Sequence, residues 1–397
     1  MKTYWRLPRG VDELLPPDAW ELEVLRRKVL DLFVSWGYDY VEPPVIEYLD
    51  ALRVGSGEDL DLQTLKVVDQ VSGKQLGVRA DMTSQAVRID AHSRVTDDIQ
   101  RLCYAGNVVF ANPQLTQSSR VPFKVGAELF GSPSIAADAE VIGLMMAAVQ
   151  SAGIENPVLL IGHMGIYRSL VADLIAAGDT IDESELFACI QRKSQADIAA
   201  LMPDSALAHM LVDLPLLMGD VESIRHARDR LEGAGDSVVA ALNELEQLAR
   251  LVCVNDTQMS VRIDVSELSG YGYHNGPVFA VYHPEHGRAL TQGGRYDGVG
   301  EAFGRARAAT GFDMDLKSLL SKGGQNQDII FAPFVVAEPG GADERAAQLA
   351  KVACLRTEGE RVRVALTERE AIPENCRRLL VIVDGAWQVI DHVKNSQ

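Results

Sequence analysis

Apolar residues recur along the chain with two different periods, which together predict an α+β fold. Leu25, Val29 and Leu32 repeat at the four-three spacing of one helix face, so a helix is expected from Asp18 to the glycine at position 37. Short β-rich runs separated by turn residues predict strands. The expected strands cover 38–41, 65–68, 75–78, 101–110, 123–130, 158–161, 259–263, 278–282 and 288–292, and further helices follow position 83 and cover 137–152 and 311–320.

Shifts in composition divide the chain into a large and a small part. Residues 166–251 are helical in pattern and acidic, with Gly and Pro breaks, which predicts a helical insertion. A polar, glycine-rich run at 321–327 is typical of a linker. We therefore expect a core over 1–325 and a small α/β C-terminal segment over 326–397.

Charge and cysteine content narrow the class of protein. The 397 residues carry 38 Lys and Arg against 56 Asp and Glu, a net charge of −18, which disfavours nucleic acid as the main partner. The five cysteines are scattered without a CxxC pair, which favours reduced thiols in a cytoplasm and gives no zinc site. No signal core or apolar run of about 18 residues suggests a membrane segment. We expect a cytoplasmic protein without a metal or cofactor.

One hairpin combines aromatic, polar and glycine residues in a way that suits a binding site. Tyr271, Tyr273 and His274 precede the strand at 278–282, and Gly293 and Gly294 follow its partner. Paired glycines allow close approach to the backbone because no Cβ is present. The alternative is that they only bend the strand, and spacing alone favours that simpler interpretation.

Two further segments, one around Asp81 and one around Glu128, carry a carboxylate that could belong to a binding site. Asp81 and Thr83 lie between a strand and a helix, where they could form a ligand site or serve as the N-cap, and the cap is the simpler interpretation. Glu128 falls inside an apolar strand. If it is buried, this carboxylate needs a partner or a functional reason. The alternative is that it lies on a solvent-exposed face of the strand.

Several motifs, taken in order, resemble histidyl-tRNA synthetase and its paralogues. The similarity covers about residues 6–320 and implies a class II aminoacyl-tRNA synthetase-like core. Such a core is a six-stranded antiparallel sheet flanked by helices, paired as a homodimer through the class II interface. The matching segments are Leu7–Asp12 (LPRGVD), Pro44–Glu47 (PVIE), Val78–Thr83 (VRADMT), Phe123–Gly131 (FKVGAELFG), Tyr273–Phe279 (YHNGPVF) and Gly293–Gly298 (GGRYDG).

The chain departs from the synthetase pattern where that family binds ATP. Three family arginines, in motif 2, in the histidine-recognition motif and in motif 3, align with Ala111, Ser269 and Ser318. Adenylation depends on such charges, each worth a few kcal/mol in the transition state. Lys317 and Lys124 are candidate substitutes, but a flexible ammonium does not reproduce a bidentate arginine clamp. We expect no catalytic residue in this chain.

The histidine half of the family's pocket is retained in type. Asp81 stands where the family has Glu, Lys124 replaces a Gln, and His274 replaces a Tyr. The resemblance implies a histidine-binding set made of Asp81, Thr83, Lys124, Glu128, Tyr271, Tyr273, His274, Gly293 and Gly294.

A chain that retains the histidine pocket but lacks the arginines that bind ATP resembles the regulatory subunits of ATP phosphoribosyltransferase. That resemblance implies a non-catalytic subunit in the first step of histidine biosynthesis, which activates a short catalytic subunit and mediates feedback inhibition by histidine. It also implies a hetero-octamer. Two alternatives stay open: a synthetase-like binding module for another partner, and an atypical histidyl-tRNA synthetase.

Overall fold

The computed structural model divides the chain into two compact units. The larger unit contains Met1–Glu13 and Leu22–Leu320, and the smaller contains Leu14–Glu21 and Ser321–Gln397. Each unit is described by itself. The structure describes residues 4, 6–53, 62–112, 119–255, 259–268, 270, 272–320, 328–336 and 342–392.

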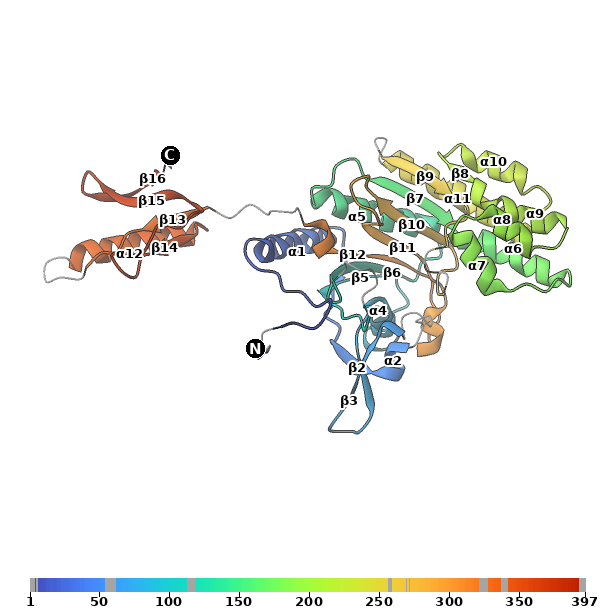
Figure 1. The fold of residues 1–397 in the computed structure, drawn as a ribbon, viewed down its shortest axis with the longest axis horizontal. Coiled ribbons are helices and arrows are strands. Elements are labelled where there is room, and N and C mark those ends of the chain that lie inside the picture. Colours follow the sequence, from blue (N-terminus) through green and yellow to red (C-terminus); the bar gives the residue numbers. More distant parts are fainter. Residues whose placement is uncertain are drawn as a thin grey trace. The chain divides into compact units, whose positions relative to one another are not determined.

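A nine-stranded sheet organises the larger unit (Figure 1). Its six central strands, in the order β5-β6-β12-β11-β10-β7, pair antiparallel throughout, which confirms the predicted six-stranded antiparallel sheet. β1 pairs parallel at the outer edge, as expected for a strand followed by prolines. In sheet order the strands are β1 (Asp39–Tyr40), β5 (Gln100–Asn107), β6 (Phe123–Phe130), β12 (Ala309–Asp315), β11 (Thr291–Arg295), β10 (Pro277–Tyr282), β7 (Val158–His163), β9 (Ser260–Asp264) and β8 (Met218–Gly219).

Two sequence predictions in this sheet are wrong. The segment 311–320 was expected to be helical, but its first half, 311–315, belongs to β12, and Leu316–Leu319 forms a short 3-10 helix. Pairing with β6 and β11 overrides local propensity here. The strand expected at 288–292 lies instead at Thr291–Arg295. Gly293 and Gly294 therefore lie within the strand and not beyond its end.

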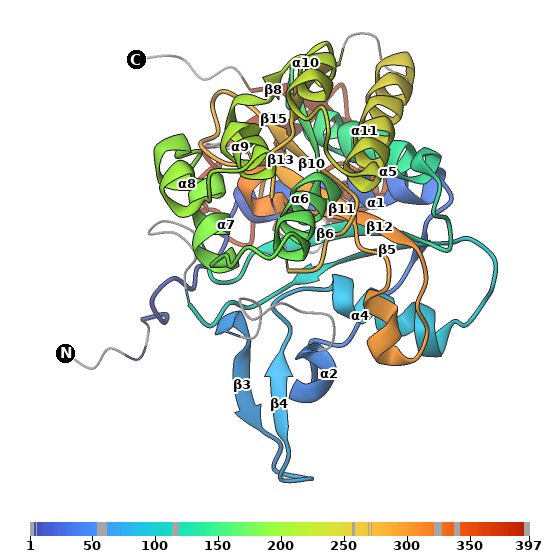
Figure 2. The same cartoon turned by 90° about the vertical axis from the view of Figure 1, so that its right-hand side faces the viewer.

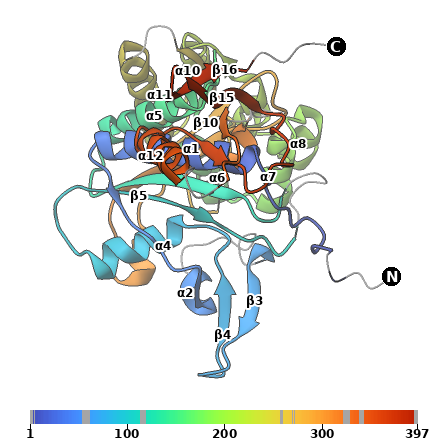
Figure 3. The same ribbon diagram turned by 90° about the vertical axis from the view of Figure 1, so that its left-hand side faces the viewer.

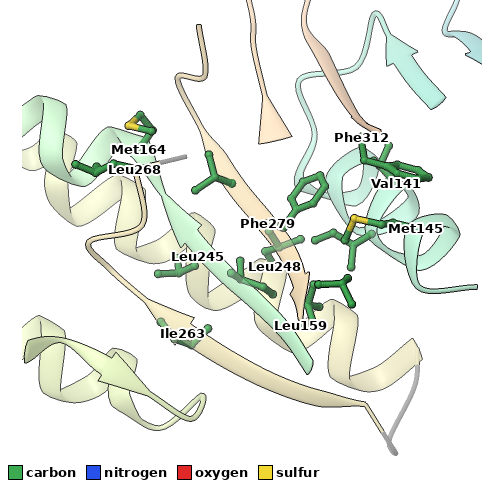
Figure 4. Packing of buried hydrophobic residues seen from close by; sticks show 14 of the residues in the cluster. Val141, Met145, Leu159, Met164, Leu245, Leu248, Ile263, Leu268, Phe279 and Phe312 are labelled. Atoms are coloured by element: carbon green, nitrogen blue, oxygen red, sulfur yellow. The ribbon is translucent and has the colours of Figure 1, made fainter. Parts of the chain in front are cut away.

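The two faces of the sheet are covered differently. Helices α1 (Asp18–Ser35), α5 (Ile135–Ser151), α6 (Met164–Ala176) and α11 (Asp236–Asn255) contribute to the large core on one face, and α4 (Thr83–Arg88) lies on the other (Figure 2). Figure 4 shows part of the large core, where strands meet α5 and α11, through Leu159, Phe279, Phe312, Val141, Met145, Leu245 and Leu248.

Strand alternation decides which β6 side chains face which layer. Val125, Ala127 and Leu129 belong to the large core, so Lys124 and Glu128, at even positions, face the α4 side. The less covered face of the sheet thus carries the charged residues.

The chain between β7 and β9 is helical apart from the short strand β8. Lys193, directly after α7, donates from Nζ to Asp264 Oδ2 at 2.6 Å, and this bond ties the insertion to the end of β9. Besides α6 and α11, the segment contains α7 (Glu183–Gln191), α8 (Gln195–Leu201), α9 (Ala206–Asp213) and α10 (Ser223–Arg230).

A small three-stranded sheet projects from the larger unit (Figures 2 and 3). Its order is β2 (Ile46–Tyr48), β4 (Gln75–Val78) and β3 (Leu65–Val68), and α2 (Leu49–Arg53) covers one face, since a Cβ on Gly77 would lie 2.7 Å from Leu52. The register places six apolar side chains together on the opposite face. This arm face consists of Ile46, Tyr48, Leu65, Val67, Leu76 and Val78.

The smaller unit is a four-stranded sheet with one helix. Strands β14 (Val362–Val364), β13 (Ile329–Ala332), β15 (Cys376–Val383) and β16 (Ala386–Asp391) lie in that order, and α12 (Ala342–Thr357) contacts one face. Asp384 and Gly385 both have positive φ, which suits the tight turn between the antiparallel strands β15 and β16.

A buried ion pair fixes the glycine strand β11 to the start of α5. Arg295 donates from Nη2 to Asp138 Oδ2 at 2.7 Å, and its other donors reach the carbonyl oxygens of Ser132 and Ser134. Both side chains of the pair are almost wholly buried. Loss of Arg295 would leave the buried charge of Asp138 without its partner, whereas Arg295 also pairs with Asp297 at 3.2 Å.

We predict that Arg295→Met lowers the free energy of unfolding of the chain by about 3–5 kcal/mol, because Asp138 would stay buried and unpaired. Urea denaturation followed by circular dichroism measures the change. Arg94→Met is the control, since its pair with Asp39 is exposed and should be worth under about 1 kcal/mol. Equal losses in the two variants would contradict the structural role of the Arg295 pair.

Candidate functional site

Glycines create the floor of the candidate site on the α4 side of the sheet. A Cβ on Gly126 would lie 2.5 Å from the ring of Tyr104, and a Cβ on Gly311 would lie 1.6 Å from Glu128 Oε2. Tyr104 and Glu128 therefore extend across neighbouring strands where side chains are missing. On β11, Gly294 makes room in the same way for the ring of His274.

The carboxyl group of Glu128 lies at the centre of this floor. It is 1% exposed, and the hydroxyls of Tyr104 and Tyr296 donate to its two oxygens at 2.8 and 2.6 Å. Burial raises its pKa to about 8, although both tyrosine hydrogen bonds act in the opposite direction. The buried carboxylate that the sequence singled out thus has two partners.

Asp81 and Thr83 approach the site from the segment before α4. Asp81 Oδ1 accepts the N–H of Met82 at 2.7 Å, and the hydroxyl of Thr83 lies 3.2 Å from that of Tyr104. The interpretation of either residue as the helix N-cap is wrong, because Met82 occupies that position without a side-chain cap. Burial and the nearby charge of Asp313 raise the pKa of Asp81.

An ion pair between β6 and β12 forms another side of the site. Lys124 Nζ donates to Asp313 Oδ1, and each side chain is about one-fifth exposed. Both residues also line a recess of about 260 Å³. The recess is further lined by Phe110, Ser119, Arg288, Ala289, Leu290, Thr291, Gln292, Met314, Asp315 and Ser318.

Aromatic rings close the site from the loop before β10. The ring of Tyr273 lies 4.2 Å from that of His274 and 6.0 Å from that of Tyr296, centroid to centroid. Asn275 holds this loop in place, because its side chain bonds both the N–H and the carbonyl oxygen of Asp297. Desolvation by the surrounding groups and the charges of Asp81, Asp313 and Glu128 raise the pKa of Tyr273, although 36% of the residue is exposed.

The structure brings most of the expected site residues together and separates one. Gly293 lies on the opposite face of the sheet, where a Cβ would meet Phe279 and Phe312. Tyr271 lies outside the described residues. The gathered residues are Asp81, Thr83, Lys124, Glu128, Tyr273, His274 and Gly294.

Sequence reasoning missed three residues that hold this arrangement. Tyr104 and Tyr296 bind Glu128, and Asp313 binds Lys124. Gly126 opposite Tyr104 on paired strands was an available signal. It could be used only with the strand register, which a single sequence does not supply.

The positions of the expected lost arginines make local structural contacts. The N–H of Ala111 donates to the carbonyl of Gln63 at 2.7 Å, and Ser318 Oγ donates to that of Asp315 at 2.7 Å. Ser269 lies outside the described residues. Lys317 is engaged elsewhere, because its Nζ donates to Val121 O at 2.6 Å and pairs with Asp12.

Neither a metal centre nor a membrane helix is found in the described part of the chain. Its His, Cys, Asp and Glu side chains form no group of three or more that could hold a metal ion. None of its helices has both the length and the apolar character needed to cross a membrane.

We predict that Glu128→Gln changes how the stability of the chain depends on pH. Because the folded state holds the Glu128 proton up to about pH 8 while the unfolded state loses it near 4.5, this group lowers stability as pH rises between those values. Within that window, the free energy of unfolding of the variant should rise relative to that of wild type by up to about 1.4 kcal/mol per pH unit. Urea denaturation at several pH values measures it, and parallel pH profiles would contradict it.

Comparison with known proteins assigns both parts of the chain. A family model described as Histidyl-tRNA synthetase matches residues 10–319. A second, described as ATP phosphoribosyltransferase subunit HisZ C-terminal domain, matches residues 328–390. The solved structure of an ATP phosphoribosyltransferase regulatory subunit/histidyl-tRNA synthetase from Bacillus halodurans is similar, with a TM-score of 0.81, 26% identity and coverage of 96% of this chain and 98% of that one.

More distant structures share the fold alone. Histidyl-tRNA synthetase from Nostoc has a TM-score of 0.76 at 16% identity, and the match covers 98% of this chain and 97% of that chain. The nine-stranded sheet with its six antiparallel strands is therefore the class II synthetase-like core.

Curated relatives match along almost the whole length. ATP phosphoribosyltransferase regulatory subunits from Chromohalobacter salexigens and Pseudomonas savastanoi are 47% and 45% identical, and each match covers 97% of this chain and 98% of the relative. Together with the family-specific C-terminal domain, this identity shows that the chain belongs to the family of ATP phosphoribosyltransferase regulatory subunits.

Proposed function

We propose that the site on the α4 side of the sheet binds histidine and that its occupancy sets the activity of a catalytic partner. In this proposal the ligand's ammonium lies near Asp81 and Glu128, and its imidazole lies near Tyr273. Binding stabilises an assembly state in which the partner turns over slowly, with a coupling free energy of about 1–3 kcal/mol. The observation that carries the proposal is the cluster of acidic and aromatic side chains around Glu128, together with a recess that Lys124 and Asp313 share with Ser318, which supplies no charge for ATP.

The electrostatics of the site support an ammonium ligand. Asp81 accepts bonds from its own chain through one oxygen, and an ionised carboxylate has about four lone-pair positions. Asp313 adds a second carboxylate, and its charge contributes to the raised pKa of Asp81. A cation entering this site would offset that repulsion, whereas a simple anion would increase it.

We further propose the short-form catalytic subunit as the partner, in a cytoplasmic hetero-octamer built on regulatory homodimers. The match to a C-terminal domain described for this family supports a family-specific partner. The net charge of −18 supports a protein partner in preference to nucleic acid.

The homodimer is proposed through the class II interface, with the arm face beside it. Val45 and Ile46 of the matching segment are more than half exposed, and on the arm face Tyr48, Leu65 and Val67 are 37–48% exposed. Contiguous exposed apolar side chains of this kind mark interaction surfaces. The segment is held in place from within, because Gln85 donates to Pro44 O and Glu47, and Arg88 pairs with Glu47.

Enzyme assays with the catalytic subunit test the effector role. We expect the intact chain to raise the turnover of the catalytic subunit, and histidine to reverse this rise only when the chain is present. Asp81→Asn should raise the histidine concentration needed for half-inhibition about tenfold or more, because the ammonium loses a charged acceptor. Activation itself should change little.

Asp229→Asn serves as the control, because it removes an exposed carboxylate from helix α10 and should leave inhibition unchanged. Unaltered inhibition in Asp81→Asn would show that histidine acts elsewhere. Inhibition of the catalytic subunit without this chain would show that the chain is not the sensor.

A separate variant tests the interface. Ile46→Asp should convert the homodimer to a monomer in sedimentation velocity experiments, because it would place a charge at the centre of an apolar contact. Val71→Asp, at the 96% exposed tip of the arm, should leave the mass unchanged. A dimer that persists in Ile46→Asp would exclude this face as part of the interface.

A further inference from the structure

We propose that Lys124, held by Asp313, binds the α-carboxylate of the effector, so that the site selects an amino acid over an amine or alcohol with the same side chain. This assignment rests on the proposed histidine site and adds to it the group that binds the carboxylate of the ligand.

The bonding of Lys124 leaves donors available for a ligand. An ammonium has three N–H donors and no acceptor. Lys124 Nζ uses one of them on Asp313, and no second hydrogen-bond partner is recorded for it in the described part of the chain. Its side chain is 21% exposed and lines the recess, so these donors are accessible to a ligand that enters from the recess. A carboxylate is a suitable acceptor for a charged donor.

The surroundings of Lys124 keep it charged and in position. Burial alone would lower its pKa, but the charges of Asp313 and Asp81 raise the pKa above its ordinary value. Asp313 belongs to β12, next to β6, so the pair also fixes the direction of a long side chain across two strands. An ammonium held in this way has less conformational freedom to lose when it binds a ligand.

The pattern of charges favours a zwitterion over other ligands. Asp81 and Asp313 would repel a ligand that is only anionic, and Lys124 would repel one that is only cationic. An α-amino acid carries both charges on one carbon. It matches Asp81 with its ammonium and Lys124 with its carboxylate. Asp81 is linked through Thr83 and Tyr104 to Glu128, which lies on the same face of β6 as Lys124.

Arg288 is the competing cation, because it also lines the recess. It is exposed, and it precedes β11 in a turn. An exposed guanidinium in water contributes less to binding than a partly buried ammonium does. The two candidates make different predictions for the variants below.

Titration calorimetry of the intact chain with L-histidine and L-histidinol tests the assignment, because histidinol has an alcohol in place of the carboxylate. The test variant is the double substitution Lys124→Gln with Asp313→Asn, which removes both charges together and retains a hydrogen-bonding pair. We expect wild type to prefer histidine by about tenfold or more and the double variant to show a preference of about threefold or less.

Two controls complete the design. Arg288→Gln should retain the wild-type preference. The double substitution Arg363→Gln with Glu370→Gln removes an ion pair of 3.0 Å in the smaller unit, and it should also retain the wild-type preference for histidine. Thermal unfolding of each variant establishes that it is folded.

A tenfold preference that persists in the Lys124 and Asp313 double variant would overturn the assignment while leaving the histidine site intact. Loss of preference in Arg288→Gln alone would transfer the carboxylate to that residue. If wild type bound neither ligand, the proposed effector role itself would fail and the assignment with it.

Discussion

The buried carboxyl of Glu128 is the constraint on which the rest of the site depends. A carboxyl group inside a sheet needs partners, and Tyr104 and Tyr296 supply them from β5 and from the residue after β11. The Tyr104 ring has room because Gly126 lacks a side chain, and the carboxyl of Glu128 has room because Gly311 does. One buried polar group therefore fixes the rings and strands that surround the ligand site.

The two faces of the sheet have different roles: one packs the core, and the other carries the candidate site. Its helix-covered face is a continuous apolar core, and the other face carries the charged and aromatic residues. Arg295 and Asn275 join the two functions, because they attach β11 and the Tyr273 loop to the main body. Two positions that the resemblance aligns with synthetase arginines, Ala111 and Ser318, make local contacts with the backbone in this framework.

The sequence predicted the class of fold and most of the site, for identifiable physical reasons. The motifs around Asp81, Glu128 and Tyr273 carry their chemistry locally, so they could be found without a structure. The pairing of Lys124 with Asp313, and the placement of Gly293 on the far face, depend on register between strands far apart in the chain. The error at 311–320 has the same origin, because pairing with two neighbouring strands made β12 from residues expected to be helical.

Direct binding of histidine to the isolated chain tests the central claim most directly. Equilibrium dialysis with labelled histidine, without any catalytic subunit present, should give one site per chain, and an excess of histidinol should compete only weakly. Absence of binding to the isolated chain would contradict the account, because the site described here lies wholly within one larger unit.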